Sequence, residues 1–309
     1  MRQGAVALLI AVAALTSCST ESVSPPASAG AAATASTATK APTATKTSAT
    51  GAPAAAAPAG KAPSGNLPVK VRKLRLSRGK DRPLPTTVWY PATGEGPFPV
   101  IVFSHGLTAR PGDYGRLLTR WAGAGFVVAG AAYPHTSAGV ADFDVIDLIN
   151  QPADASHVLT EVLALDTRAG DPLRGRLDGE HVAAAGHSGG GITTIGMLSG
   201  DRDDRLDAAV VLAGRQVLPV PFSGPAAPVF FVHGSLDRTV RYADGLAAFD
   251  AVPWPKAMLT IPDGGHVTTD GGDFSLVATA TTDFWRWSLY GDTAAKRRLE
   301  GRRNVESDL

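Results

Sequence analysis

The 309-residue sequence has a single cysteine, Cys18, and its charges nearly cancel, with 29 Lys and Arg against 28 Asp and Glu. One cysteine excludes an intramolecular disulfide and any metal cluster built on cysteines. The balanced charge, without a basic run, argues against nucleic acid as a partner. The N-terminal apolar run from Ala5 to Leu15 is too short to span a membrane. The chain is nevertheless long enough for one large domain with a full core.

The first eighteen residues have the pattern of an export signal. Arg2 precedes the apolar run, which ends in Leu15-Thr16-Ser17-Cys18. This pattern resembles the signal of bacterial lipoproteins, in which the cysteine is lipidated after cleavage just before it. The resemblance implies a signal peptide over residues 1–17, palmitate or a similar acyl group on Cys18, and a lipid anchor on the extracytoplasmic side of the bacterial membrane. The alternative is an ordinary secretory signal with an incidental cysteine.

Aromatic residues are missing from the stretch that follows. Residues 18–65 are almost all Ala, Ser, Thr, Pro and Gly, and their apolar content is mainly alanine. Such a composition buries too little surface to offset the entropy lost on ordering. We therefore expect a disordered tether over 18–65 and a catalytic domain over 66–309.

From Leu67 onward, short apolar or β-branched runs alternate with helical patterns. This alternation predicts an α/β fold with an eight-stranded, mostly parallel, doubly wound sheet. The expected strands are an antiparallel opening pair, Val69–Leu76 and Thr86–Tyr90, and the parallel runs Val100–Phe103, Phe126–Ala131, His181–Ala185, Ala208–Ala213, Val229–Val232 and Met258–Ile261. The expected helices are Asp113–Ala124, Pro152–Leu165, Gly190–Leu198, Tyr242–Phe249 and Phe274–Tyr290. Sheets of this kind bind ligands beyond the carboxyl ends of their strands, so the chemistry is expected there.

The fifth expected strand leads into Gly186-His187-Ser188-Gly189-Gly190, which fits the pattern G-x-S-x-G. This pattern is typical of a sharp strand-to-helix turn that holds a nucleophilic serine at its point. A serine hydroxyl is a poor nucleophile without a base, so Ser188 needs a histidine partner.

The sequence has seven histidines, of which His266 follows the last expected strand in a glycine-containing loop. In α/β-hydrolases the chain order is serine, acid, histidine, and this order selects His266. Structural or supporting roles are expected for the other six, which are His105, His135, His157, His181, His187 and His233.

The acid must lie between the serine and the histidine in the chain. The segment from Gly214 to Pro228 contains no Asp or Glu, so the first carboxylate after the next strand is Asp237. We therefore expect Asp237 to orient His266. Asp244, Asp263 and Asp270 are alternatives, although each fits a helix cap or a turn more easily.

A tetrahedral intermediate also needs donors for its oxyanion. One is expected from the backbone N–H of Gly189, directly after the nucleophile. The second is expected from the loop after the third strand, where Gly106 lets the chain turn inward and the N–H of Leu107 can point at the site.

The motifs FSHGL, GHSGGG, HGSLDRTV and GGH, in this order at the strand ends, resemble the α/β-hydrolase family over residues 67–290. More narrowly, they are similar to the group of platelet-activating-factor acetylhydrolase, chlorophyllase and bacterial polyester hydrolases, as is QPADASHVLTEVL before the serine. Polyester hydrolases typically carry a tryptophan just after the sixth strand, where this chain has Ala213-Gly214-Arg215-Gln216. The resemblance implies an α/β-hydrolase fold, and the short interval after the sixth strand predicts that there is no cap domain.

Together these features predict a monomeric serine hydrolase that cleaves small-molecule or lipid carboxylic esters through an acyl-enzyme, with no cofactor and no metal. An open cleft with little apolar wall, bounded by the loop Tyr133–Asn150, predicts acyl chains of roughly two to six carbons and no interfacial activation. Alternatives are a polyester, cutin or phospholipid-acetyl hydrolase, an acyltransferase, or a catalytically silent envelope-binding module.

Overall fold

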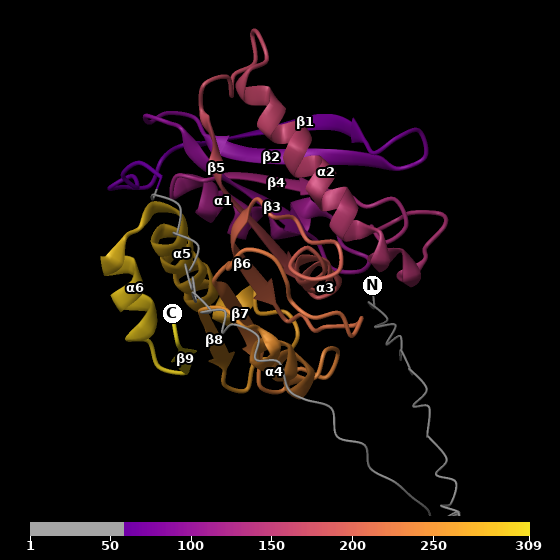
Figure 1. Ribbon diagram of the computed structural model, residues 1–309, viewed down its shortest axis with the longest axis vertical. Coiled ribbons are helices and arrows are strands. Elements are labelled where there is room, and N and C mark those ends of the chain that lie inside the picture. The colour runs from indigo at the N-terminus through magenta and orange to yellow at the C-terminus, as the bar shows by residue number, and fades with distance from the viewer. Residues whose placement is uncertain (1–58) are drawn as a thin grey trace, which may run out of the picture. The chain divides into compact units, whose positions relative to one another are not determined.

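The structure is a computed structural model that describes residues 59–309. The predicted signal peptide, Cys18 and the tether up to residue 58 lie outside the described residues. Within them, one nine-stranded sheet carries helices on both faces (Figure 1). The strands are β1 (Val69–Ser77), β2 (Pro83–Pro91), β3 (Phe98–Ser104), β4 (Val127–Ala131), β5 (Leu177–His187), β6 (Leu206–Leu212), β7 (Val229–Gly234), β8 (Lys256–Ile261) and β9 (Val305–Ser307).

The helices lie between and after these strands. The α-helices are α1 (Gly115–Gly123), α2 (Gln151–Leu163), α3 (Gly189–Gly196), α4 (Tyr242–Ala251), α5 (Phe274–Tyr290) and α6 (Thr293–Glu300). Short 3-10 helices are η1 (Pro111–Tyr114), η2 (Val145–Ile149), η3 (Ala164–Asp166) and η4 (Gly271–Asp273).

The strand order is β1-β2-β4-β3-β5-β6-β7-β8-β9. Strands β3 to β8 are parallel to one another, whereas β1, β2 and β9 run antiparallel to their neighbours. This confirms the predicted α/β-hydrolase fold with a mostly parallel sheet, but the predicted count of eight strands is wrong. The ninth strand has three residues and no apolar run, so its sequence gives no strand signal, and it forms by pairing with β8.

The sheet separates two hydrophobic cores. Helices α2, α3 and α4 cover one face, where Leu159 and Phe249 pack on strand residues such as Val102. Helices α1, α5 and α6 cover the other face, where Trp121 of α1 meets Trp285 of α5 edge to face at 5.7 Å between ring centroids. Because both faces are covered, the parallel strands read as nearly continuous apolar runs, which is why the sequence located them.

The packed domain starts before the expected boundary at residue 66. The N–H of Ala59 donates to the carbonyl of Leu289 at 3.1 Å, and Arg286 donates to the carbonyl of Pro63 at 2.9 Å. Ala59 and Ala62 are buried in the core that α5 covers. Residues 59–65, expected in the tether, therefore belong to the folded domain.

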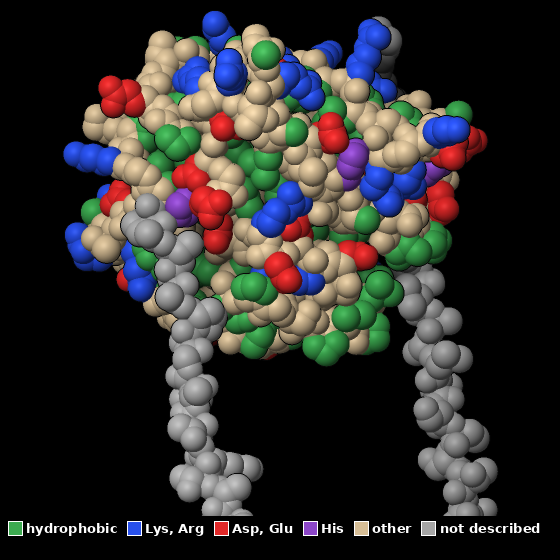
Figure 2. Space-filling view, turned by 45° about the horizontal axis from the view of Figure 1, so that its top comes forward, with side chains coloured by type: hydrophobic (Ala, Val, Ile, Leu, Met, Phe, Trp, Pro, Cys, Tyr) green, Lys and Arg blue, Asp and Glu red, His purple; other side chains and the backbone are tan. Residues whose placement is uncertain are grey.

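The predicted site residues that the structure describes all lie at the carboxyl ends of the parallel strands, in loops or, for Gly189, at the first residue of α3. Between residues 59 and 309 no separate cap domain covers these loops, and no helix is long and apolar enough to cross a membrane. Figure 2 shows charged side chains of both signs scattered among small apolar patches on the face it presents.

Candidate active site

Ser188 lies at the sharp turn between β5 and α3, with φ 56° and ψ −117°. A left-handed φ is strained for a residue with a side chain, and it holds the hydroxyl at the tip of the turn. Two glycines make this turn possible by close backbone approach. A Cβ on Gly186 would overlap the carbonyl of Gly190, and a Cβ on Gly190 would overlap the carbonyl of Ser104. The glycines around Ser188 are thus required by packing.

His266 lies in the loop after β8 and reaches across to the turn. Its Nε2 is 2.8 Å from Ser188 Oγ, and its Nδ1 is 2.7 Å from Asp237 Oδ2. The structure therefore brings together the three residues that the sequence order selected. With Nδ1–H donating to the carboxylate, Nε2 is free to accept the serine proton.

Asp237 follows β7 and its carboxylate is buried. Its Oδ1 accepts hydrogen bonds from the backbone N–H of Thr239 at 2.8 Å and of Val240 at 3.0 Å, which leaves Oδ2 for His266. Burial raises the pKa of Asp237, but hydrogen bonds from His233 and His266 outweigh it and hold the pKa well below its usual range. The carboxylate is therefore ionised at neutral pH, as an orienting group must be.

The alternative acids are engaged elsewhere. Asp244 pairs with Arg241 at 2.8 Å on the surface, and Asp270 caps η4 by accepting from the N–H of Gly271 at 2.8 Å. Asp263 lies in a turn with φ 56°, where its N–H donates to Ser235 Oγ at 2.9 Å. None of these contacts is with His266.

His233, at the end of β7, is a second histidine beside the acid. It is fully buried, and its Nε2 lies 2.9 Å from the carbonyl of Val240 and 3.3 Å from Asp237 Oδ2. Both of these oxygens are acceptors, so Nε2 carries the proton and its N–H donates to both of them. A structural or supporting role was expected for His233, and its contact with Asp237 is a supporting one. The spacing of four residues between the two is the signal that could have named this partner.

The two expected oxyanion donors lie next to each other. A Cβ built on Gly189 would be 3.4 Å from the backbone nitrogen of Leu107, and one on Gly106 would be 3.3 Å from Ser188 Cβ. The loop after β3 therefore packs directly against the turn that carries the nucleophile. This places both N–H groups beside Ser188, where an oxyanion would form.

A hydrogen-bonded chain joins this loop to the histidine loop. The N–H of Gly106 donates to Tyr114 Oη at 3.1 Å, and Tyr114 Oη lies 2.8 Å from His187 Nδ1. His187 Nε2 then donates to the carbonyl of His266 at 2.9 Å. His187 therefore fixes the backbone of the catalytic histidine, a role that the sequence did not reveal because Tyr114 lies 73 residues away.

His187 and His105 are neutral for a common physical reason. Burial is the main cause that lowers the pKa of each to about 4. His105 Nδ1–H donates to the carbonyl of Gly106 at 2.8 Å, while its Nε2 accepts from the backbone N–H of Tyr133 at 3.2 Å. Both imidazoles are thus neutral, and their hydrogen bonds stabilise the loop after β3 that carries Leu107.

Over residues 59–309, no group of three or more His, Cys, Asp or Glu side chains is arranged to hold a metal ion. The chemistry available to the site is that of a serine activated by an oriented imidazole, next to two backbone donors. Such an arrangement suits acyl transfer from an ester.

Comparison with known proteins agrees with this chemistry. No curated protein matches the chain. The model of the family described as PETase, PET hydrolase-like, matches residues 42–296, which include every residue of the site. The chain therefore belongs to the PET hydrolase-like family, an α/β-hydrolase-type family of polyester hydrolases, and is an ester hydrolase.

Proposed function

We propose that the protein is a serine hydrolase that cleaves carboxylic esters of short-to-medium acyl chains through an acyl-enzyme. The observation that carries this proposal is the continuous line from Ser188 Oγ to His266 at 2.8 Å and from His266 to Asp237 at 2.7 Å. Membership of an ester-hydrolase family supports the same chemistry.

Acylation begins when Ser188 Oγ attacks the ester carbonyl carbon and its proton passes to His266 Nε2. The carbonyl oxygen becomes an oxyanion, which the N–H groups of Leu107 and Gly189 stabilise. The ester C–O bond then breaks, and His266 gives the proton to the departing alcohol. Asp237 stays ionised throughout and stabilises the imidazolium.

Deacylation repeats these steps with water as the nucleophile. His266 takes a proton from the water while the water oxygen attacks the acyl carbon. The carboxylic acid then leaves as His266 returns the proton to Ser188 Oγ. No cofactor takes part in either half of the reaction. An acyltransferase would differ only in accepting an alcohol in place of this water.

Among esters, we propose that the enzyme prefers those whose acid part is aliphatic. The tryptophan that resemblance to polyester hydrolases implies just after β6 is replaced by Ala213-Gly214-Arg215-Gln216. The aromatic residue of the loop between β6 and β7 is Phe222, which packs against Trp254 at 5.9 Å between ring centroids. The β6–β7 loop therefore does not supply the tryptophan face on which an aromatic acid would stack.

A fluorophosphonate probe tests the proposal. We expect it to label the wild type at Ser188 and to leave Ser188→Ala unlabelled. Ser188→Ala and His266→Ala should each lower kcat for p-nitrophenyl butyrate by several orders of magnitude, and the double variant should be hardly worse than either, because the residues act as a unit. Labelling at another residue, or additive losses, would contradict the assignment.

We also propose that the enzyme works at the cell envelope as a monomer held by a lipid on Cys18. The Leu15–Cys18 pattern and the Ala, Ser, Thr and Pro composition that follows it support this placement. Stable attachment requires more than one acyl chain, which lipoprotein modification supplies.

A further inference from the structure

An apolar groove lies beside the catalytic residues and has no role in the steps described above. Leu148 and Ile149 of η2 form one wall, Ile192 and Ile195 of α3 form its floor, and the β6–β7 loop around Val217 forms the opposite wall. The space between these walls is about 480 Å³ when the open solvent at the mouth is counted with it. From the sequence we expected a cleft with little apolar wall. The structure instead has this groove, whose walls are mainly apolar.

One wall of the groove comes close to the residue after the nucleophile, although Ser188 itself does not line the groove. The side chain of Leu148 lies 3.2 Å from the position of a Cβ on Gly189, the expected oxyanion donor. Ile192 is one helical turn beyond Ser188, and its N–H donates to the carbonyl of Ser188 at 3.1 Å. The groove thus lies next to the oxyanion donor, on the side of α3 that carries Ile192, within reach of a chain attached to a carbonyl carbon at Ser188 Oγ.

The position of His266 decides which part of the ester enters. The departing alcohol must lie beside His266 Nε2 to receive its proton. No residue of the loop that carries His266 or of the loop that carries Asp237 lines the groove. Resting on the proposed function, we infer that the groove binds the aliphatic acyl chain of the substrate and that the alcohol lies on the histidine side.

The exposed residues of the walls favour an apolar occupant. Ile149 is 52% exposed, Val217 49% and Leu218 53%, although large hydrophobic residues are rarely this exposed together without a partner. An alkyl chain in the groove would cover all three. The mainly apolar lining offers no cation for a charged acid.

The length of α3 sets the length of the chain. From Gly189 to Gly196 the helix rises by about 10 Å. An extended alkyl chain advances about 1.3 Å per bond, so about eight carbons fill the groove. This places the preferred acyl chain at the medium end of the proposed range and beyond the two to six carbons expected from the sequence.

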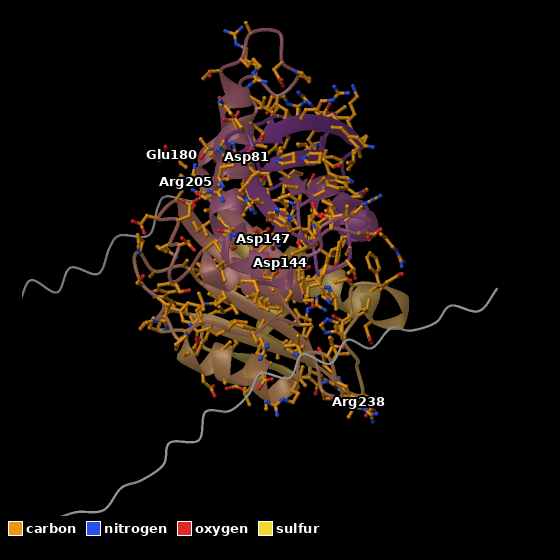
Figure 3. All side chains as sticks on the ribbon, turned by 90° about the vertical axis from the view of Figure 1, so that its right-hand side faces the viewer. Asp81, Asp144, Asp147, Glu180, Arg205 and Arg238 are labelled. Atoms are coloured by element: carbon orange, nitrogen blue, oxygen red, sulfur yellow. The ribbon has the colours of Figure 1, made fainter. Side chains whose placement is uncertain are left out.

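An ion-pair cluster holds one wall in place. Arg82 donates to both carboxylate oxygens of Asp147 in η2, at 2.8 and 2.9 Å, and also pairs with the buried Asp154 of α2. Asp147, which lies in η2, is labelled in Figure 3. Because η2 is fixed from behind, the groove is preformed and the acyl chain need not order it.

The test compares kcat/KM for p-nitrophenyl acetate, hexanoate, octanoate and dodecanoate below their micelle concentrations. One fully buried methylene is worth about fourfold in binding, so six half-covered methylenes predict that octanoate exceeds acetate about sixtyfold. Replacing Val217 and Leu218 together by serine should lower this ratio at least fivefold. The matched control is Val71→Ser, because Val71 of β1 is as exposed as Val217 and Leu218. This variant should keep the wild-type ratio of octanoate to acetate cleavage.

A second variant narrows the groove just beyond the end of α3, where Gly200 lines it. A Cβ on Gly200 would lie 3.7 Å from Val220 Cγ1, in ordinary contact, so Gly200→Leu can fold and should move the maximum to chains shorter than eight carbons. An unchanged chain-length profile in both variants, or faster cleavage of a benzoate than of octanoate, would overturn the inference alone. Absence of any ester hydrolysis and of fluorophosphonate labelling in the wild type would overturn the proposed function and the inference with it.

Discussion

Acid should destabilise the fold through two buried histidines, His105 and His187. Burial lowers the pKa of each to about 4, whereas in the unfolded chain the value is near 6.5. Because the folded pKa is depressed, the stability is fully present above pH 6.5 and is lost as the pH falls towards 4. One pH unit within this window costs about 1.4 kcal/mol per histidine, so acidification to pH 5 costs about 2 kcal/mol each.

The two histidines together therefore cost about 4 kcal/mol at pH 5, a large part of the 5–15 kcal/mol typical of a folded domain. Asp237 and the other carboxyls with lowered pKa values lose their contribution below their unfolded value near 3.8, outside this window. Asp207, whose pKa burial raises, acts in the opposite direction, but it is the same in wild type and variants and cancels in their comparison.

Urea unfolding at pH 7.5, 6 and 5 measures this effect. In a double variant, His105→Asn keeps a donor for the carbonyl of Gly106, and His187→Gln keeps one for the carbonyl of His266. It should be less stable than the wild type at pH 7.5 but should change by less than about 1 kcal/mol down to pH 5. Each single variant should retain about half of the wild-type pH dependence. Equal pH dependence in wild type and double variant would refute the reasoning.

Four further outcomes follow from the structure and the sequence. Asp237→Asn should lower kcat for an activated ester by about 10⁴ with little change in the unfolding midpoint, because the imidazole loses its orienting anion; wild-type turnover would move the acid elsewhere. Arg82→Met should cost about 3 kcal/mol in urea unfolding, because it removes the cation that buried Asp147 and Asp154 share and leaves Asp154 with Arg78 alone; a cost below 1 kcal/mol would contradict this. Gly190→Ala should abolish soluble expression, whereas Gly265→Ala, with open space for a Cβ, should fold normally by circular dichroism. Cys18→Ala should release the protein from the membrane fraction, and retention after a salt wash would rule out the lipid anchor.

The sequence located the parallel strands and the three residues at their ends because both depend on signals local to the chain. Buried strands such as Val100–Phe103 are unbroken apolar runs, and Ser188, Asp237 and His266 each follow such a run in the order that an α/β-hydrolase requires. The structure brings these side chains within hydrogen-bonding distance.

What the sequence missed depends on contacts between distant segments. The ninth strand needs β8 as a template, and α6 has only Ala295 and Leu299 as buried residues, too few for a helical pattern. The Tyr114–His187 contact joins residues 73 positions apart. The acyl groove is formed by three separate segments, each of which looks like an unremarkable loop or helix on its own.

The contact between Ala59 and Leu289 determines how the domain can be handled. Helix α5 starts eight residues after His266 and runs for 17 residues, about 25 Å, to its end near Leu289. The N-terminal segment therefore joins the domain at the end of α5 remote from the catalytic loops. Immobilising the protein on a bead through a tag placed ahead of residue 59 should leave the mouth of the site facing the solution, open to substrates too large to diffuse between the domain and its support.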